Sequence, residues 1–504
     1  MYKWKMASLK VFVVALALVI AGCSGGASSN NNATPSASTN TEGTATTEPV
    51  ETLDPVELTW YFINFELQTD YESVQKAIND YLQPKINTTI KFMPVLAGDY
   101  TDKMNAVAAS GEAYDLAWTS NWNFHYADNI SKGAFLELDS LLETHGKEFY
   151  ESMPEKVWED IRENGKLYAV PNYQIAAKRS GLIIQKEYAD KYNLDTSNLR
   201  TLADIEPFLE QIKQNEPDNI IPYGTQGSDF ELLFYGLTNL DPALVRENGG
   251  KLVLENRFAS PEYMDYAKLI RSWNQKGYIS LDAATLKLAE QTQTGNVVVV
   301  FDNTLKPGGE PESAQRFGGK EVIYVPMTDA QYTGVRPTLT AISKTSKNPE
   351  RAMMFLNLLN TDSELYNMVA YGLEGKHYEK LNDNTIRPIP NGGYNPGVSW
   401  VYGNELIGHL IEGKPADTIE RTIEMNNSAE LAPTFGFSFD NSEVQAENAN
   451  IKAVKTEYAT AINTGMVDPE EYIPRFLDAL NRAGIDKYIA EMQEQFDAFL
   501  ASRK

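Results

Sequence analysis

The side chains that could form covalent or metal-bound sites are few in this sequence of 504 residues. It contains one cysteine, Cys23, and four histidines, His125, His145, His377 and His409. A single thiol can form neither an intramolecular disulfide nor a cysteine-rich zinc site. The histidines are too far apart for a local metal motif such as H-E-x-x-H, and the sequence has no P-loop, G-x-G-x-x-G, G-x-S-x-G or EF-hand loop. We therefore expect no resident metal, no cofactor and no catalytic residue.

Cys23 follows a segment with the features of a secretion signal. Three lysines among the first ten residues precede an uncharged apolar run at 11–21. This run is too short to span a membrane, which takes roughly 20 residues, but it suits the apolar region of a signal peptide. The sequence Ile20-Ala21-Gly22-Cys23 resembles a bacterial lipobox. The resemblance implies that residues 1–22 are a lipoprotein signal peptide and that the thiol of Cys23 is lipidated. The alternative is an ordinary cysteine after an uncleaved anchor.

Residues 23–53 consist mostly of Ser, Thr, Asn, Gly and Ala. Such a segment has too little apolar surface to offset the entropy lost on ordering, so we expect it to be disordered. Linkers of this composition behave as flexible coils. Directly after a lipid anchor, the segment is interpreted as a tether that holds a globular body away from a bilayer. The alternative is a leader with no role.

The composition indicates a packed, acidic body. Hydrophobic residues make up 42% of the chain and aromatic residues 11%, which is typical of globular proteins. The roughly 450 residues after the tether suffice for two or three domains. A formal net charge of −25 disfavours binding to nucleic acid, which depends on Lys and Arg to neutralise phosphates. It suits solubility outside the cell.

The hydrophobic pattern predicts an α/β fold. From residue 58 to residue 118, segments rich in aromatic and β-branched residues alternate with segments whose apolar residues recur every three or four positions, the pattern of a parallel α/β sheet. The predicted strands are 58–63, 88–93, 114–118, 182–184, 297–301 and 322–325. The predicted helices are 71–82, 99–110, 202–214, 261–277, 348–359 and two in 469–501, with a break near Gly484.

Three stretches occur in an order that resembles one family. They are GKLYAVPNYQ at 165–174, AISKTSKNPERAMMFLNLLNTDSELYN at 341–367, and PTFGFSFDNSEVQAEN at 433–448 followed by the terminal helix at 483–500. Together with the lipobox and tether, they resemble the extracellular solute-binding proteins of ABC importers. The C-terminal stretch resembles a lipoprotein-anchored subfamily described as aldouronate-binding.

The resemblance implies a two-lobed clamp of the periplasmic-binding-protein type (type II). Each lobe is expected to be a mostly parallel sheet flanked by helices, with a hinge between the lobes. By matching segments, lobe one is 54–162 plus 326–375, and lobe two is 163–325 plus 376–504. Ligand binding closes such clamps, and the closed form docks on an ABC permease in the membrane. We expect a monomer, lipid-anchored on the outer face of a bacterial plasma membrane, with no nucleic-acid partner.

An oligosaccharide site needs flat aromatic side chains for the apolar sugar faces and polar side chains for the hydroxyl groups. Ligands of open α/β sheets bind where strands end, which favours loop residues after the predicted strands and at the lobe crossing. Core packing is the alternative for Trp118 and Phe437, and an Asx turn is the alternative for the pair at 302–303. The candidates are Asn64, Glu66, Trp118, Ser120, Trp122, Tyr173, Gln174, Asp302, Asn303, Trp400 and Phe437.

Arg336 is a candidate for an acidic sugar. It lies where the chain is expected to return to lobe one, and its planar guanidinium could bind the carboxylate of a uronate. Lys178 and Arg179 are further candidates for that carboxylate. The alternative for each is a salt bridge at the hinge.

The function predicted from these residues and the resemblance is capture of an oligosaccharide for delivery to the permease, with an acidic xylo-oligosaccharide or aldouronate as the candidate ligand. One rival is a secreted glycoside hydrolase, which needs two facing carboxylates about 5–9.5 Å apart. With 69 acidic residues, such pairs are unavoidable and prove nothing. A second rival is a sugar-sensing or adhesion module without transport.

Overall fold

The computed structural model describes residues 53–227 and 235–502. The predicted signal peptide at 1–22, Cys23 and all but the last residue of the predicted tether lie outside the described residues. Among the helices of the described ranges, none is long and apolar enough to cross a membrane.

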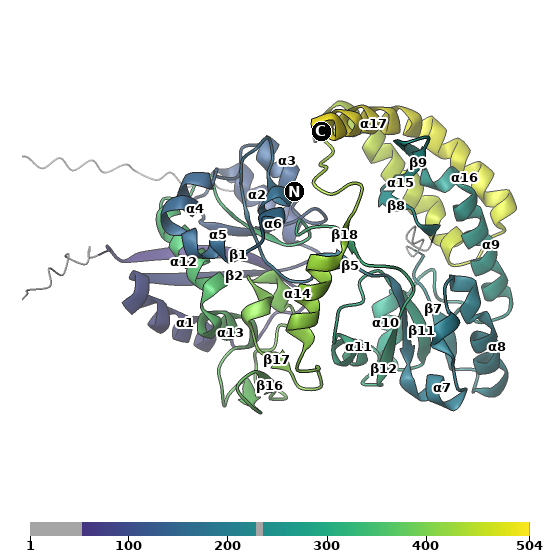
Figure 1. The fold of residues 1–504 in the computed structure, drawn as a ribbon, viewed down its shortest axis with the longest axis horizontal. Coiled ribbons are helices and arrows are strands. Elements are labelled where there is room, and N and C mark those ends of the chain that lie inside the picture. The colour runs from purple at the N-terminus through teal and green to yellow at the C-terminus, as the bar shows by residue number, and fades with distance from the viewer. Residues whose placement is uncertain (1–52, 228–234, 503–504) are drawn as a thin grey trace, which may run out of the picture. The chain divides into compact units, whose positions relative to one another are not determined.

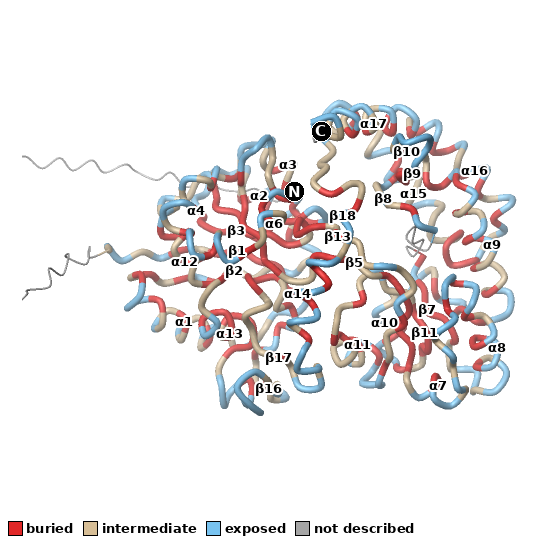
Figure 2. The backbone as a smooth tube through the Cα atoms, in the orientation of Figure 1, coloured by how far each residue is buried: buried red, intermediate tan, exposed pale blue. Residues whose placement is uncertain are grey.

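Two hydrophobic cores organise the described part of the chain (Figures 1 and 2). One core collects buried side chains from residues 58–176 and 332–435. The second collects buried side chains from residues 182–325 and 444–496. We call these two parts lobe one and lobe two. The chain therefore passes between the lobes three times, which confirms the predicted two-lobed α/β class.

Lobe one is built on a five-stranded sheet of order β2-β1-β3-β14-β4. Helices cover the sheet because their apolar residues recur every three or four positions. In the first helix, for example, Val74, Ile78 and Leu82 are all fully buried. The elements are β1 (Val56–Asn64), α1 (Tyr71–Ile86), β2 (Thr88–Leu96), α2 (Tyr100–Ser110), β3 (Leu116–Thr119), α3 (Tyr126–Ser131), α4 (Asp139–His145), α5 (Lys147–Glu151), α6 (Glu155–Ile161), β4 (Val170–Pro171), β14 (Leu339–Ile342), α12 (Pro349–Thr361) and α13 (Ser363–Tyr371).

Lobe two contains a four-stranded sheet of order β12-β6-β11-β7, a three-stranded sheet and three C-terminal helices. The predicted strand at 297–301 is buried on both faces, since Val298 and Val299 enter one cluster and Val297 and Val300 enter another. Gly484 separates the last two helices as predicted, with a φ of +89° that suits glycine. The elements are β6 (Gly181–Gln185), α7 (Lys186–Lys191), α8 (Glu206–Asn215), β7 (Ile221–Gly224), β8 (Thr238–Leu240), β9 (Ala243–Asn248), β10 (Lys251–Asn256), α9 (Pro261–Gln275), α10 (Leu288–Gln293), β11 (Val297–Asp302), α11 (Glu310–Arg316), β12 (Val322–Pro326), α15 (Gln445–Asn463), α16 (Pro469–Ala483) and α17 (Ile485–Ser502).

In each main sheet one strand runs against the others, so the sheets are mixed while most of their strands point in one direction, as expected. In lobe one, β1 pairs in parallel with β2 and β3, but β14 is antiparallel to β3. In lobe two, β6 is antiparallel to both β11 and β12. The reason is the crossing of the chain. A strand that enters a lobe from the hinge starts where the other strands end, so it must run in the opposite direction.

A small sheet joins the three crossing segments. It has the order β18-β13-β5, with β5 at Ala177–Lys178, β13 at Gln331–Tyr332 and β18 at Glu430–Leu431. Its central strand is antiparallel to β5 and parallel to β18. Because each lobe is joined to the other by short strands hydrogen-bonded side by side, this sheet is the hinge between them.

Residues 376–435 were predicted to belong to lobe two, but their buried side chains pack in the core of lobe one. Tyr378, Ile386, Tyr394 and Tyr402 are all members of that core. The hydrophobic pattern marked these residues as buried without indicating which core they join. The segment contains β15 (Tyr378–Lys380), β16 (Thr385–Pro388), β17 (Leu410–Ile411) and α14 (Thr418–Ser428).

Asp70 ties this segment to the start of α1. Its carboxylate accepts hydrogen bonds from the backbone N–H of Ser73 (3.4 Å) and from Nζ of Lys376 (2.5 Å), and it lies 2.9 Å from Nε2 of His377. Since Nδ1 of His377 accepts from the N–H of Leu373, Nε2 carries the proton and donates to Asp70. The hydrogen bond from Lys376, followed by that from the Ser73 hydroxyl, holds the pKa of Asp70 well below its ordinary value of 3.8.

We expect Asp70→Ala to lower the free energy of unfolding by about 1–2 kcal/mol at pH 7, because a helix cap is lost together with the link to residue 376. A lowered pKa in the folded state stabilises the protein above the unfolded pKa, and this contribution is lost as the pH falls below about 4. The variant should therefore lose less stability than the wild type between pH 4 and pH 2. Urea unfolding across this pH range measures both effects. Asp80→Ala, at an exposed site on the same helix, is the control, and an equal loss in both variants would contradict the prediction.

Candidate functional site

Four aromatic side chains form a chain of contacts at the carboxyl ends of β1 and β3. The rings of Trp118 and Trp122 lie 5.3 Å apart, those of Trp118 and Trp400 6.4 Å, and those of Phe65 and Trp400 6.5 Å. Trp118 is fully buried, whereas Trp122 is 45% exposed and Phe65 62% exposed. The structure thus brings together the three predicted tryptophans. Buried Trp118 supports two partly exposed rings on either side of it.

Hydrogen bonds fix the orientation of both neighbouring indole rings. Nε1 of Trp118 donates to Oγ1 of Thr338 (2.9 Å), and Nε1 of Trp122 donates to the backbone carbonyl of Pro337 (2.9 Å). The hydroxyl of Ser120 accepts from the N–H groups of Trp122 (3.2 Å) and Asn123 (2.8 Å). Ser120 is fully buried, so it shapes the turn that presents Trp122. The platform is therefore rigid before any ligand arrives.

Asn64 and Glu66 lie at the same end of β1 but differ in accessibility. Asn64 is fully buried and donates to the hydroxyl of Tyr71. Its Oδ1 has no hydrogen-bond partner among the described residues. Glu66 is exposed. Of these two candidates, only Glu66 has a side chain that solvent reaches.

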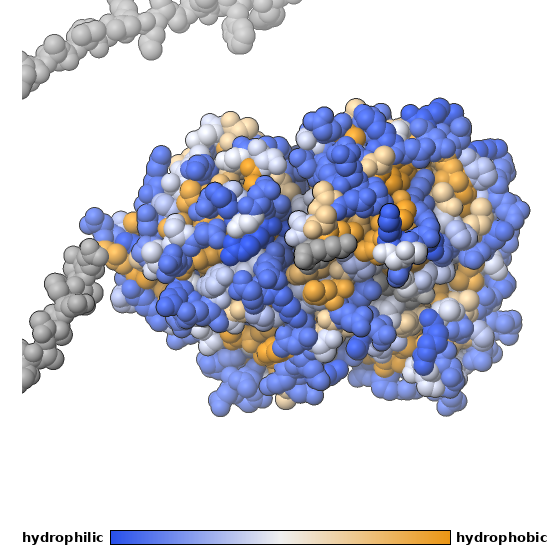
Figure 3. Space-filling view, turned by 45° about the horizontal axis from the view of Figure 1, so that its top comes forward, coloured by the Kyte–Doolittle hydropathy of each residue, from blue (hydrophilic) through white to orange (hydrophobic). Residues whose placement is uncertain are grey.

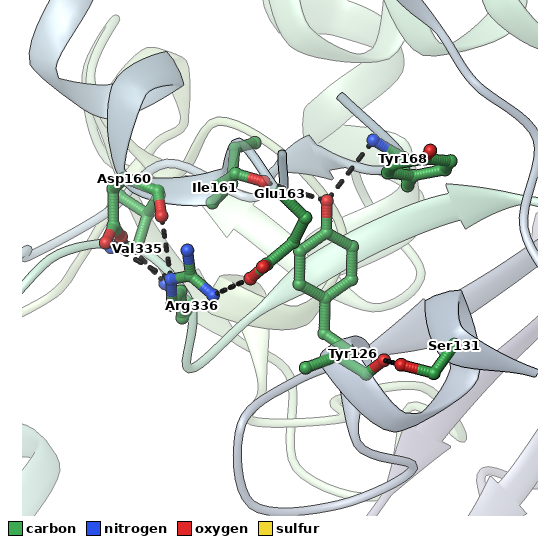
Figure 4. A network of polar contacts seen from close by, with 9 residues as sticks. Tyr126, Ser131, Asp160, Ile161, Glu163, Tyr168, Val335 and Arg336 are labelled. Atoms are coloured by element: carbon green, nitrogen blue, oxygen red, sulfur yellow. Dashed lines mark hydrogen bonds and ion pairs between the residues drawn. The ribbon is translucent and has the colours of Figure 1, made fainter. Parts of the chain in front are cut away.

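Arg336 lies in a buried ion-pair network, shown in Figure 4. Its Nε donates to the carbonyl of Asp160 (2.7 Å) and lies 3.4 Å from the Asp160 carboxylate, and its Nη1 donates to Oε1 of Glu163 (2.5 Å). The Asp160 carboxylate also accepts from the N–H of Val335 (2.6 Å). Burial raises the pKa of Asp160, and Arg336 opposes this rise. Arg336 therefore forms a salt bridge, which was the alternative to its predicted role in binding a uronate.

Gly334 allows the backbone beside Arg336 to approach the Asp160 carboxylate closely. A β-carbon at this position would come within 2.1 Å of Oδ2 of Asp160, and φ is +94°. Both the space and the backbone conformation therefore require glycine.

Tyr173 and Gln174 are held where the chain leaves lobe one. Tyr173 is buried in that core, and Nδ2 of Asn426 donates to the carbonyl of Gln174 (2.8 Å). Oδ1 of Asn426 accepts from the N–H groups of Ala176 and Ala177 (2.8 and 3.1 Å). Asn426 thus clamps the first crossing segment. The sequence analysis missed this residue because an asparagine inside a helix carries no signal for a partner 250 residues away.

Asp302 and Asn303 form, at the end of β11, the Asx-type turn that was the alternative to their predicted role in binding sugar. Oδ1 of Asp302 accepts from the N–H of Thr304 (2.8 Å), and its other oxygen lies 3.3 Å from Arg316. Asn303 is exposed at the hinge end of the strand.

The remaining candidates occupy different surroundings. Phe437 packs against Phe496 (5.0 Å between ring centroids) and Phe499 (5.4 Å) in the C-terminal helices, which is the packing role named as its alternative. Lys178 and Arg179 follow the crossing segment, and neither forms an ion pair with the described residues.

A cleft of about 680 Å³ lies between the two lobes. Lobe one contributes residues 121–132 and Arg336, while lobe two contributes residues 240–242, the linker at 437–442 and faces of α15 and α17. Figure 3 shows a mostly hydrophilic face on which apolar side chains gather toward the middle. In the ranges 53–227 and 235–502, no group of three or more His, Cys, Asp or Glu side chains is arranged to hold a metal ion.

The chain matches two family profiles. Residues 66–364 match the profile described as bacterial extracellular solute-binding protein. Residues 433–501, which include the three C-terminal helices, match a domain of unknown function, DUF3502.

Similar proteins cover most of the chain. A carbohydrate ABC transporter substrate-binding protein of Streptococcus pneumoniae is 31% identical over 84% of this chain and 87% of its own length. The crystal structure of the N-glycan transport solute-binding protein NgtS from the same species is 28% identical, with a TM-score of 0.78 over 90% of this chain and 100% of that one. NgtS has also been solved in complex with Man1GlcNAc (TM-score 0.73, 28% identity, 88% and 100% covered) and with Man5GlcNAc (TM-score 0.69, 28% identity, 90% and 100% covered). The two-lobed fold, the profile match and the relatives agree: the chain belongs to the family of bacterial extracellular solute-binding proteins of ABC transporters.

Proposed function

We propose that this protein is a lipid-anchored extracellular receptor that captures an oligosaccharide between its lobes and delivers it to an ABC permease. The observation that carries the proposal is the aromatic platform of Trp118, Trp122, Trp400 and Phe65. A half-exposed indole packed edge to face against a buried one offers its own ring face to the apolar face of a sugar. Glu66, next to Phe65 in the chain, and Asn303, at the hinge end of a lobe-two strand, offer a carboxylate and an amide for its hydroxyl groups.

The hinge provides the mechanism of capture. A ligand that contacts both lobes stabilises the closed arrangement more than the open one, and only this difference in affinity can drive closure. The three short strands of the hinge sheet allow rotation with little loss of packing, because each core lies entirely within one lobe. Closure then presents both lobes together to the permease. Binding without chemistry is also what the names of the relatives describe.

We propose a neutral oligosaccharide in preference to an aldouronate. The guanidinium of Arg336 already faces the carboxylates of Asp160 and Glu163, so it cannot offer its planar fork to a uronate. Lys178 and Arg179 are the remaining sequence candidates for recognition of an acidic sugar. The S. pneumoniae relative NgtS has been solved with mannose-containing glycans, which gives the first ligands to test.

The test is calorimetric titration of residues 53–504 with Man5GlcNAc, xylo-oligosaccharides, aldouronates and short peptides. We expect a dissociation constant in the micromolar range or tighter for a neutral oligosaccharide, with release of no hydrolysis product on prolonged incubation. A ligand at 100 times its dissociation constant should also stabilise the fold by about 2.7 kcal/mol. Preferential binding of aldouronates would support an acidic sugar as the ligand, and cleavage of an oligosaccharide would favour a hydrolase. Binding of peptides alone would overturn the sugar assignment.

A further inference from the structure

The cleft of about 680 Å³ lies beside the aromatic platform and is larger than the platform needs. Its volume falls within the roughly 300–1,000 Å³ of small-molecule sites. One wall is α3 with the turn before it, and the opposite wall is the helical C-terminal module at 433–501. The proposed function assigns no specific role to the residues of this second wall.

The cleft is continuous with the platform through a shared wall. The N–H of Asn121 donates to the carbonyl of Arg336 (3.0 Å), and both residues line the cleft. The next residues along each segment, Trp122 and Pro337, are joined by the indole hydrogen bond of 2.9 Å. The platform and the cleft therefore adjoin through the neighbouring residue pairs 121–122 and 336–337.

The walls of the cleft have the mixed chemistry that sugars require. Ile451, Tyr488 and Met492 form an apolar base and are themselves buried. Burial, with smaller effects from Asp241 and Asp128, raises the pKa of Tyr488 to about 12, so its phenol stays neutral.

Polar side chains line the rim of the cleft. Their amide, imidazole and ammonium groups form no side-chain hydrogen bond or ion pair with the described residues, so they are free to meet a ligand. These side chains are Asn121, His125, Gln445, Asn448 and Lys452.

The charges in the cleft are either paired or balanced in sign. Two acidic and two basic lining residues form no ion pair with the described residues: Asp128, Asp440, Lys132 and Lys452. Nζ of Lys455 pairs with Asp241, and Arg336 pairs with Asp160 and Glu163. The cleft therefore offers amides, hydroxyls and an apolar base without a concentrated charge of either sign. This chemistry fits a neutral carbohydrate better than a nucleotide or an acidic peptide.

We infer that this cleft is a second carbohydrate subsite, in which the C-terminal module contacts the outer units of a long or branched neutral oligosaccharide whose first units stack on Trp122. The inference rests on the proposed function and assigns a role to the module: it sets the length and branching of the ligand. Gln445 and Asn448 are its specificity-determining residues. They lie three positions apart on one face of α15, directed at the cleft they line.

The experiment compares a short and a long glycan on matched variants of residues 53–504. Man1GlcNAc and Man5GlcNAc are titrated into the wild type, Gln445→Ala/Asn448→Ala and the control Asn450→Ala. Asn450 is an exposed asparagine of the same helix that does not line the cleft. All three proteins should have the same thermal midpoint, because the altered side chains make no contacts that hold the fold.

We expect the wild type to bind Man5GlcNAc more tightly than Man1GlcNAc. The double variant should lose about tenfold or more in affinity for Man5GlcNAc, the effect of two lost hydrogen bonds, with no change for Man1GlcNAc. Asn450→Ala should bind both as the wild type does. Unchanged affinity of the double variant for Man5GlcNAc, or an equal loss for both glycans, would overturn the subsite while leaving the proposed function intact. Failure of the wild type to bind either glycan would overturn both for these sugars.

Discussion

Asp160→Ala is expected to lower the free energy of unfolding by about 3–5 kcal/mol, because it leaves the buried guanidinium of Arg336 with one carboxylate partner in place of two. Arg336 is only 9% exposed, so water cannot replace the lost partner. The backbone N–H groups of Val335 and Arg336 would lose an acceptor as well. Urea unfolding at pH 7, followed by circular dichroism, measures the change.

Two further variants distinguish the loss of the ion pair from the general effect of shortening a side chain on α6. Glu159→Ala changes the exposed neighbour on the same helix and should alter stability by no more than about 0.5 kcal/mol. Adding Arg336→Met to Asp160→Ala should recover part of the loss, since the buried guanidinium that had lost a partner is then absent. A loss for Asp160→Ala as small as that for Glu159→Ala would show that the network contributes little.

Trp122→Ala is expected to weaken binding of the oligosaccharide by about 30-fold, or about 2 kcal/mol, the loss typical of an aromatic hot spot. The ring is 45% exposed, and its one hydrogen bond is to the Pro337 carbonyl. Its removal should therefore cost the fold no more than about 1 kcal/mol. Calorimetric titration measures the affinity, and thermal unfolding measures the stability.

Trp122→Phe keeps a flat ring and should retain most of the affinity. Leu281→Ala removes an apolar side chain that is even more exposed but lies outside both the platform and the cleft, and it should leave binding unchanged. If Trp122→Ala binds the same glycan as tightly as Leu281→Ala does, the platform is not the binding surface. Trp118→Ala would not serve as a test, because Trp118 is fully buried and its loss would destabilise the fold by about 3–5 kcal/mol.

Local patterns in the sequence were enough to predict the class of the fold and many of its elements. The three- and four-residue spacing of Val74, Ile78 and Leu82 predicts a helix that buries one face, and the structure has it. The valine-rich run at 297–301 predicts a strand buried on both sides. Such signals are short in range, since each depends only on neighbours along one helix or strand. They also located Trp122 after a strand end, where it is exposed.

Long-range pairings were decided only by the tertiary structure. Arg336 could have faced either a ligand or the hinge, and its partner Asp160 lies 176 residues earlier in the chain. Residues 376–435 look buried in the sequence, but only packing shows that they join lobe one. A hydrophobic pattern indicates that a side chain is buried, but it does not indicate which residues that side chain packs against. The sequence by itself therefore determined the helices, the strands and the α/β class, while the crossing of the chain at the hinge determined the strand directions, the lobe boundaries and the cleft beside Trp122.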